Sequence, residues 1–103
     1  MNRAPVRIEL LDWEAARPLA APIRFAVFVE EQKVPAELEI DDQDARCVHA
    51  LARDAEGTAL GTGRLLPDGH IGRMAVLRDA RKLGVGSALL AALMDEADRK
   101  SVV

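Results

Sequence analysis

The spacing of apolar residues changes abruptly between the middle and the last part of the chain. In the middle, segments 46–53, 58–66 and 70–76 read as strands separated by short glycine-containing turns. After residue 84, apolar residues recur every four positions, the spacing of one helix face, at Val85, Leu89, Leu93 and Ala97. The change predicts an antiparallel meander followed by a helix over 85–100, and therefore a mixed α/β (α+β) fold.

The first part of the chain predicts one strand and one interrupted helix. Residues 6–11 alternate apolar with polar, as a half-buried strand does. Asp12 can cap a helix from Trp13, which Pro18 and Pro22 are expected to interrupt before apolar, helical sequence resumes at 23–29. A loop or short helical turn follows at 34–38, and residues 101–103 resemble the start of one more strand, parallel to 70–76. We expect helices on the faces of a mainly antiparallel sheet.

Composition narrows the class of protein. A chain of 103 residues predicts a single domain over 1–103. The formal net charge of −3 argues against nucleic-acid binding, and the apolar residues are too interrupted for a membrane span. Cys47 is the single cysteine, which excludes an internal disulfide and a multi-cysteine metal site. With no signal-like N-terminus, we expect a cytoplasmic protein without a metal, a nucleic-acid partner or a membrane partner.

The stretch that joins the last predicted strand to the helix predicts an anion site. The first amides of a helix have no internal partner, and the helix dipole adds positive charge there. Gly84 and Gly86 allow close backbone approach, and Arg81 and Lys82 add positive charge beside them. The spacing fits neither a P-loop nor a dinucleotide-binding fingerprint. Phosphate or pyrophosphate suits the site best; the alternative is that the glycines only cap and pack the helix start.

These residues resemble a known family. Arg81-x-x-Gly84-x-Gly86, after a strand ending in Ala75-Val76, resembles the Gln/Arg-x-x-Gly-x-Gly/Ala signature of the GNAT superfamily of acyl-CoA-dependent N-acetyltransferases. The first half is similar to one bacterial GNAT subgroup in the run Arg24–Gln32, in Val34-Pro35, in Glu39-Ile40-Asp41, and at Asp44 and His49. The resemblance extends from Val6 to Val103.

The resemblance implies a cosubstrate, acetyl-CoA, and a place for it. The strand would hold the pantetheine arm at the matching positions Met74, Ala75 and Val76. The loop would hold the pyrophosphate at Arg81, Lys82, Leu83, Gly84, Val85, Gly86 and Ser87. The implied reaction transfers an acetyl group to a primary amine of a small molecule or peptide. The amine attacks the thioester directly, with help from a base, oxyanion donors and an acid.

Candidates for contacting the amine lie in the acidic segment, Glu30 to Asp44, where seven acids accompany the single Lys33. We expect this segment to border the acceptor pocket, and its mutual repulsion to raise some carboxyl pKa values. The candidate acceptor-binding residues are Arg24, Glu31, Glu39 and Asp41, and the candidate catalytic residues are Glu31 and His49. The alternatives are a solvated acidic rim, a surface ion pair for Arg24, a satisfied core histidine, and a small buried hydrophobe at Cys47.

The sequence also departs from the family pattern. The resemblance implies a further strand, helix and hairpin beyond the last helix, with the acid for the leaving thiolate, often Tyr, among them. This chain has no Tyr. We therefore expect a C-terminally truncated domain with weak or absent turnover, whose open sheet edge allows a homodimer. The alternatives are a non-catalytic acyl-CoA-binding fragment or module, and an acyl transferase of homoserine-lactone synthase type.

Overall fold

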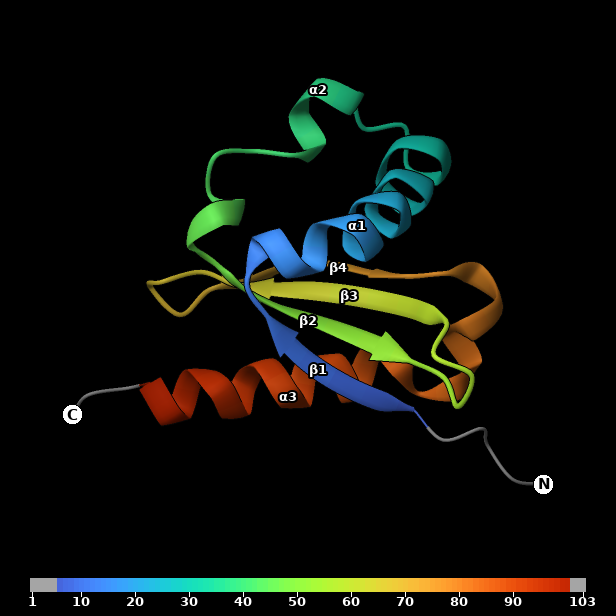
Figure 1. Ribbon diagram of the computed structural model, residues 1–103. Helices are drawn as coiled ribbons and strands as arrows, with labels where there is room; N and C mark the ends of the chain where they lie inside the picture. The colour runs from blue at the N-terminus through green and yellow to red at the C-terminus, as the bar shows by residue number, and fades with distance from the viewer. Residues whose placement is uncertain (1–5, 101–103) are drawn as a thin grey trace.

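A computed structural model describes residues 6–100, which form one antiparallel sheet with helices on both faces (Figure 1). The sheet has the strand order β1-β2-β3-β4. Its strands are β1 (Arg7–Leu11), β2 (Val48–Arg53), β3 (Ala59–Leu65) and β4 (Ile71–Val76). The helices are α1 (Trp13–Arg24), α2 (Ala36–Glu39) and α3 (Val85–Lys100), with a π-helical segment at Phe25–Glu31 and 3₁₀ segments at Asp44–Arg46 and Arg78–Leu83. The predicted fold class is confirmed; the strand expected at 101–103 lies outside the described residues.

The core on one face of the sheet is built by α3. Its predicted stripe is confirmed, because Val85, Leu89 and Leu93 are fully buried against the sheet. Two glycines of β3 let the helix come this close. A Cβ on Gly61 would lie 3.0 Å from a methyl of Leu89, and one on Gly63 would lie 3.0 Å from a methyl of Leu93. The small residues of β3 therefore set the distance between α3 and the sheet.

The other face is covered by α1, which runs through both prolines. The Asp12 side chain accepts a hydrogen bond from the Ala15 amide at 2.9 Å, so the predicted cap is confirmed. The predicted interruption at Pro18 and Pro22 is wrong, because the helix spans Trp13–Arg24. Each proline removes a helical donor, but the buried face of Ala16, Ala20 and Ile23 continues past both and packs on the sheet.

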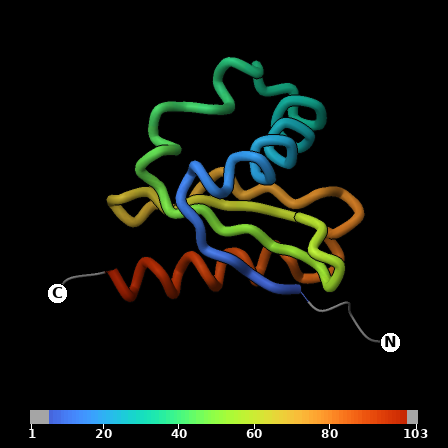
Figure 2. The backbone as a smooth tube through the Cα atoms, in the orientation of Figure 1, coloured from blue at the N-terminus to red at the C-terminus, as the bar shows by residue number. Residues whose placement is uncertain are grey.

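After α1 the helix widens into the π-helical segment. The Gln32 amide donates to the carbonyl of Val27, five residues back, at 3.1 Å. Figure 2 shows this segment, in teal, and the orange loop after β4 at the same end of the sheet. The expected strand start at residue 46 is also corrected: Asp44–Arg46 forms a 3₁₀ turn, and β2 begins at Val48.

A bulge interrupts β4. Thr62 of β3 pairs with Ala75 and Arg64 pairs with Gly72, so Arg73 and Met74 together lie opposite Gly63. Arg73 has φ +49°, in the left-handed region. A bulge leaves its extra residue unpaired and redirects the strand. No strand within residues 6–100 pairs with the outer side of β4, so the bulge lies on a sheet edge.

Candidate cofactor and acceptor site

The predicted sequence of strand, loop and helix start is present at the end of β4. The strand ends at Val76, the 3₁₀ segment Arg78–Leu83 follows, and α3 begins at Val85. Gly84 joins the two helical pieces with φ +76°, a conformation that costs a residue with a Cβ ~1 kcal/mol or more. A Cβ on Gly86 would contact only Val76, at an ordinary 3.8 Å. The backbone thus requires Gly84, whereas Gly86 leaves open space.

The residues expected to hold the cofactor divide by burial into three groups. Ala75 and Val85 are buried in the core, so only their backbone can reach a ligand. Met74, Val76, Leu83, Gly84 and Gly86 are half-buried, and Arg81, Lys82 and Ser87 are exposed. The loop therefore offers backbone from the strand and helix ends, with polar and basic side chains around it.

Glu31 lies against this loop, a contact that joins two parts of the site distant in sequence. Its carboxylate accepts from Arg81 Nη2 at 2.6 Å and from Arg78 Nη2 at 3.2 Å. Arg81 also donates through Nε to the carbonyl of Val76 at 2.9 Å. The hydrogen bond from Arg81, followed by that from Arg78, lowers the pKa of Glu31. A carboxylate held ionised in this way is a weak general base.

His49 lies in the core rather than on the surface. Its side chain is 1% exposed, its Nε2–H donates to the carbonyl of Asp44 at 2.9 Å, and its ring lies 4.8 Å from that of Trp13. Burial lowers its pKa, with the hydrogen bond to Asp44 opposing that shift. The geometry is that of a neutral, hydrogen-bonded core histidine. Cys47 is also buried, as a free thiol whose pKa is raised by burial.

Arg24 and Glu39, two of the candidate acceptor residues, are buried against each other. Arg24 is 1% exposed and forms ion pairs with the Glu39 carboxylate and with Asp44, the latter at 2.8 Å. It also donates to the carbonyl of Glu39 at 2.8 Å. Neither charged group faces solvent, so in this structure both residues fasten the acidic segment to α1 instead of presenting charge to a ligand.

For Asp41 and Asp44 the expectation of a raised carboxyl pKa is wrong, because arginines from the sheet and α1 lie between the acids. Arg64 of β3 binds Asp41 at 2.8 Å and Asp44 at 2.9 Å. The hydrogen bond from Arg64 is the largest cause that brings the pKa of Asp41 to about 2. For Asp44, burial opposes ionisation, but the bonds from Arg24 and Arg64 outweigh it and lower the pKa. Asp41 stays partly exposed and ionised.

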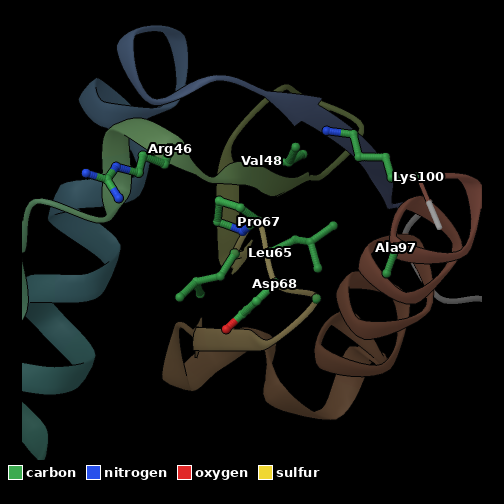
Figure 3. A pocket seen from close by; sticks show the side chains of 9 residues that line it. Arg46, Val48, Leu65, Pro67, Asp68, Ala97 and Lys100 are labelled. Atoms are coloured by element: carbon green, nitrogen blue, oxygen red, sulfur yellow. The ribbon is translucent and has the colours of Figure 1, made fainter. Parts of the chain in front are cut away.

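Two of the hollows in the described part of the chain are similar in size and have separate linings. One, of about 200 Å³, lies beside the β4 bulge and is lined by Phe28, Gln32, Val34, Glu39 and Arg73. The other, of about 210 Å³, lies between the last turn of α3 and the turn after β3 (Figure 3). Its lining includes Leu65, Asp68 and Lys100 but none of the residues that the sequence analysis assigned to a site.

No helix within 6–100 has the length and apolar character needed to cross a membrane. Across the same residues, no three His, Cys, Asp or Glu side chains gather closely enough to hold a metal ion.

Comparisons with known proteins agree with the fold. The chain is 40% identical over 74 residues to the uncharacterized N-acetyltransferase YjcF of Bacillus subtilis, covering 69% of this chain and 52% of YjcF. It is 40% identical over 72 residues to the UPF0039 protein C11D3.02c of Schizosaccharomyces pombe, covering 66% and 47% of the two chains. The chain thus spans about half the length of these curated relatives.

A solved structure shows the same arrangement. The crystal structure of an acyl-CoA N-acyltransferase from Pseudomonas aeruginosa superposes with a TM-score of 0.78 at 28% identity, covering 92% of this chain and 72% of that one. The sequence profile described as "Acetyltransferase (GNAT) family" matches residues 8–102. Because that match covers nearly the whole chain, the protein belongs to the GNAT acetyltransferase family.

Proposed function

We propose that this chain carries the acetyl-CoA site of an N-acetyltransferase that acts on a primary amine. The observation that carries the proposal is the loop at residues 77–87, where Gly84 turns the chain directly into the sixteen-residue helix α3. The Ala88 amide donates to the Gly84 carbonyl at 3.1 Å, the first hydrogen bond of α3. The amides of residues 85–87 precede this bond and have no acceptor within the helix. Those amides, the helix dipole and Arg81 would bind the pyrophosphate.

The edge of β4 would bind the rest of the cofactor. An extended pantetheine arm can add to a free strand edge through backbone hydrogen bonds. Along β4 it would pass Val76 and Met74 and bring the thioester to the bulge. There, an unpaired bulge amide would donate to the oxyanion that forms when the amine nitrogen attacks the carbonyl carbon. The C–S bond then breaks, the nitrogen loses a proton, and the thiolate of coenzyme A takes one up.

The acceptor would approach beside the bulge. The hollow lined by Phe28, Gln32, Val34, Glu39 and Arg73 opens there, and the partly exposed Asp41 lies near Arg73. An ionised carboxylate close to this opening favours a cationic amine over a neutral or anionic one. Arg24 and Glu39 are buried, and the partly exposed Glu31 is bound by Arg81 and Arg78. Asp41 is the partly exposed candidate that lies near Arg73 and this opening.

The proposal is tested by titrating coenzyme A into the chain and into two glycine variants with similar backbone strain. Gly84→Val should weaken binding more than tenfold. Gly69→Val is the matched control: Gly69 also has a positive φ, +97°, and lies in the turn after β3 with open space around it. Equal loss in both variants, or no binding by the parent chain, would contradict the site. Binding without acetyl transfer to any amine would favour the non-catalytic alternative.

A further inference from the structure

We propose that Arg73 is a positioning residue that holds the β4 bulge in place by anchoring it to the acidic segment. The inference rests on the proposed function, because the bulge is where the thioester would lie. It assigns Arg73 and Asp41 a role in turnover that is separate from binding the cofactor.

Arg73 adopts a backbone conformation that its own residue type disfavours. Its φ of +49° is left-handed, and within residues 6–100 the other non-glycine residue with positive φ is Lys33. A residue with a Cβ populates this region less readily than glycine does, by roughly fivefold or more. Side-chain contacts must therefore favour the bulge over a regular strand at this position.

The Arg73 guanidinium makes three such contacts, all with the acidic segment. Nε donates to the carbonyl of Glu39 at 3.1 Å, and Nη2 donates to the carbonyl of Leu38 at 3.3 Å and to Asp41 Oδ2 at 3.2 Å. The fixed fork of a guanidinium suits several acceptors at once. The bulge is thus tied to the end of α2 and to the residues that follow it.

The anchor itself is held from the sheet. Arg64 of β3 binds Asp41 through both terminal nitrogens, at 2.8 Å and 3.1 Å, and its backbone pairs with Gly72, the residue before Arg73. Arg64 also binds Asp44, which the buried Arg24 holds from α1. The Asp41 carboxylate therefore accepts hydrogen bonds from two arginines, Arg73 in the bulge of β4 and Arg64 on the neighbouring strand β3. The contacts join α1, the acidic segment, β3 and β4.

Loss of this anchor should affect turnover more than cofactor binding. Without it, residue 73 can relax toward an extended φ, and the extra residue can move along β4 and redirect the amides of residues 73–75. The loop at 77–87 makes none of these contacts, so the pyrophosphate contacts should remain. The affinity for coenzyme A should therefore fall less than kcat, by no more than the redirected amides of residues 74 and 75 contribute to holding the pantetheine arm. Acetyl transfer should fall at least tenfold in kcat, because the oxyanion donor is no longer aimed.

Two pairs of variants test the anchor. Arg73→Ala removes the side chain and keeps the disfavoured backbone conformation, whereas Arg73→Gly removes the side chain and the Cβ penalty together. Asp41→Asn removes the charge that Arg73 and Arg64 share, and Asp42→Asn changes its exposed neighbour as the control. The measurements are hydrogen exchange of residues 72–76, coenzyme A affinity, and kcat with a primary amine.

Hydrogen exchange at residues 72–76 should be fastest in Arg73→Ala, slower in Arg73→Gly, and parental in Asp42→Asn. Asp41→Asn should also speed this exchange. The kcat should be lowest in Arg73→Ala, higher in Arg73→Gly, and parental in Asp42→Asn. Parental exchange and kcat in Arg73→Ala and Asp41→Asn would overturn the inference. Should Arg73→Ala not fold, Arg73→Gly and Asp41→Asn decide in the same way. A parent that neither binds coenzyme A nor transfers acetyl refutes the proposed function instead, and the exchange data still judge the anchor.

Discussion

Replacing Arg24 by Met should destabilise the domain strongly. The variant keeps an apolar stem of similar length but removes the guanidinium that Glu39 and Asp44 share. Asp44 keeps Arg64, whereas Arg24 is the cation that pairs with the buried Glu39 carboxylate among the described residues. Removing one partner of a buried ion pair costs about 3–5 kcal/mol, because it leaves an uncompensated charge.

That cost is a large share of the stability of a domain of this size, which is about 5–15 kcal/mol. Each ~1 kcal/mol lowers Tm by roughly 4–8 °C in a domain of 60–100 residues, so the variant should melt at least about 12 °C below the parent. The assay is urea and thermal unfolding followed by circular dichroism. Arg17→Met is the control, since Arg17 is exposed on the same helix and also lies over the Trp13 ring.

A loss of less than ~1 kcal/mol in Arg24→Met, equal to that in Arg17→Met, would refute the reasoning, since a surface change usually costs no more than this. If Arg24 instead binds the acceptor, its variant should keep its stability and raise KM for the amine. Adding Glu39→Leu to Arg24→Met should recover part of the loss, because the unpaired charge disappears with its partner.

Three further outcomes are expected. Glu31→Gln should strengthen coenzyme A binding in titration calorimetry, because Arg81 and Arg78 lose an anionic competitor; unchanged or weaker binding would contradict this. The free energy of unfolding should fall as pH drops from about 5 to 2, because Asp41 has a lower pKa folded than unfolded and protonates over that range; Asp41→Asn should flatten the fall in urea titrations at each pH, and parallel curves would count against it. Leu93→Ala should cost about 2–5 kcal/mol by the same method, and a cost below ~1 kcal/mol would mean that α3 packs differently.

The parts of the fold that sequence predicted are those fixed by local spacing. The four-residue stripe of α3 and the glycines at its start depend on neighbours within a few positions, so the sequence alone predicts both. The prolines of α1 led to the wrong prediction of an interrupted helix, because helix propensity is a local quantity. The buried Ala16, Ala20 and Ile23 stabilise the helix through contacts with the sheet, which local sequence does not show.

The parts of the site that sequence missed depend on distant partners. The acids between Glu30 and Asp44 read as a repelling cluster because Arg64 and Arg73 lie 20 or more residues further on. The β4 bulge carries no glycine at its left-handed position, so nothing at Arg73 signalled it; its cause is the contact with residues 38–41. Glu31 was singled out for its charge, and only the folded chain shows that Arg78 and Arg81 hold it.

Amide chemical shifts mapped during a titration with coenzyme A show directly whether the cofactor binds where β4 ends and α3 begins. The largest shifts should fall on Gly84–Ser87 and on Met74–Val76, with those around Pro67 and Lys100 unchanged. Shifts concentrated at the hollow between the end of α3 and the turn after β3, or none at residues 84–87 at saturation, would contradict this placement of the cofactor.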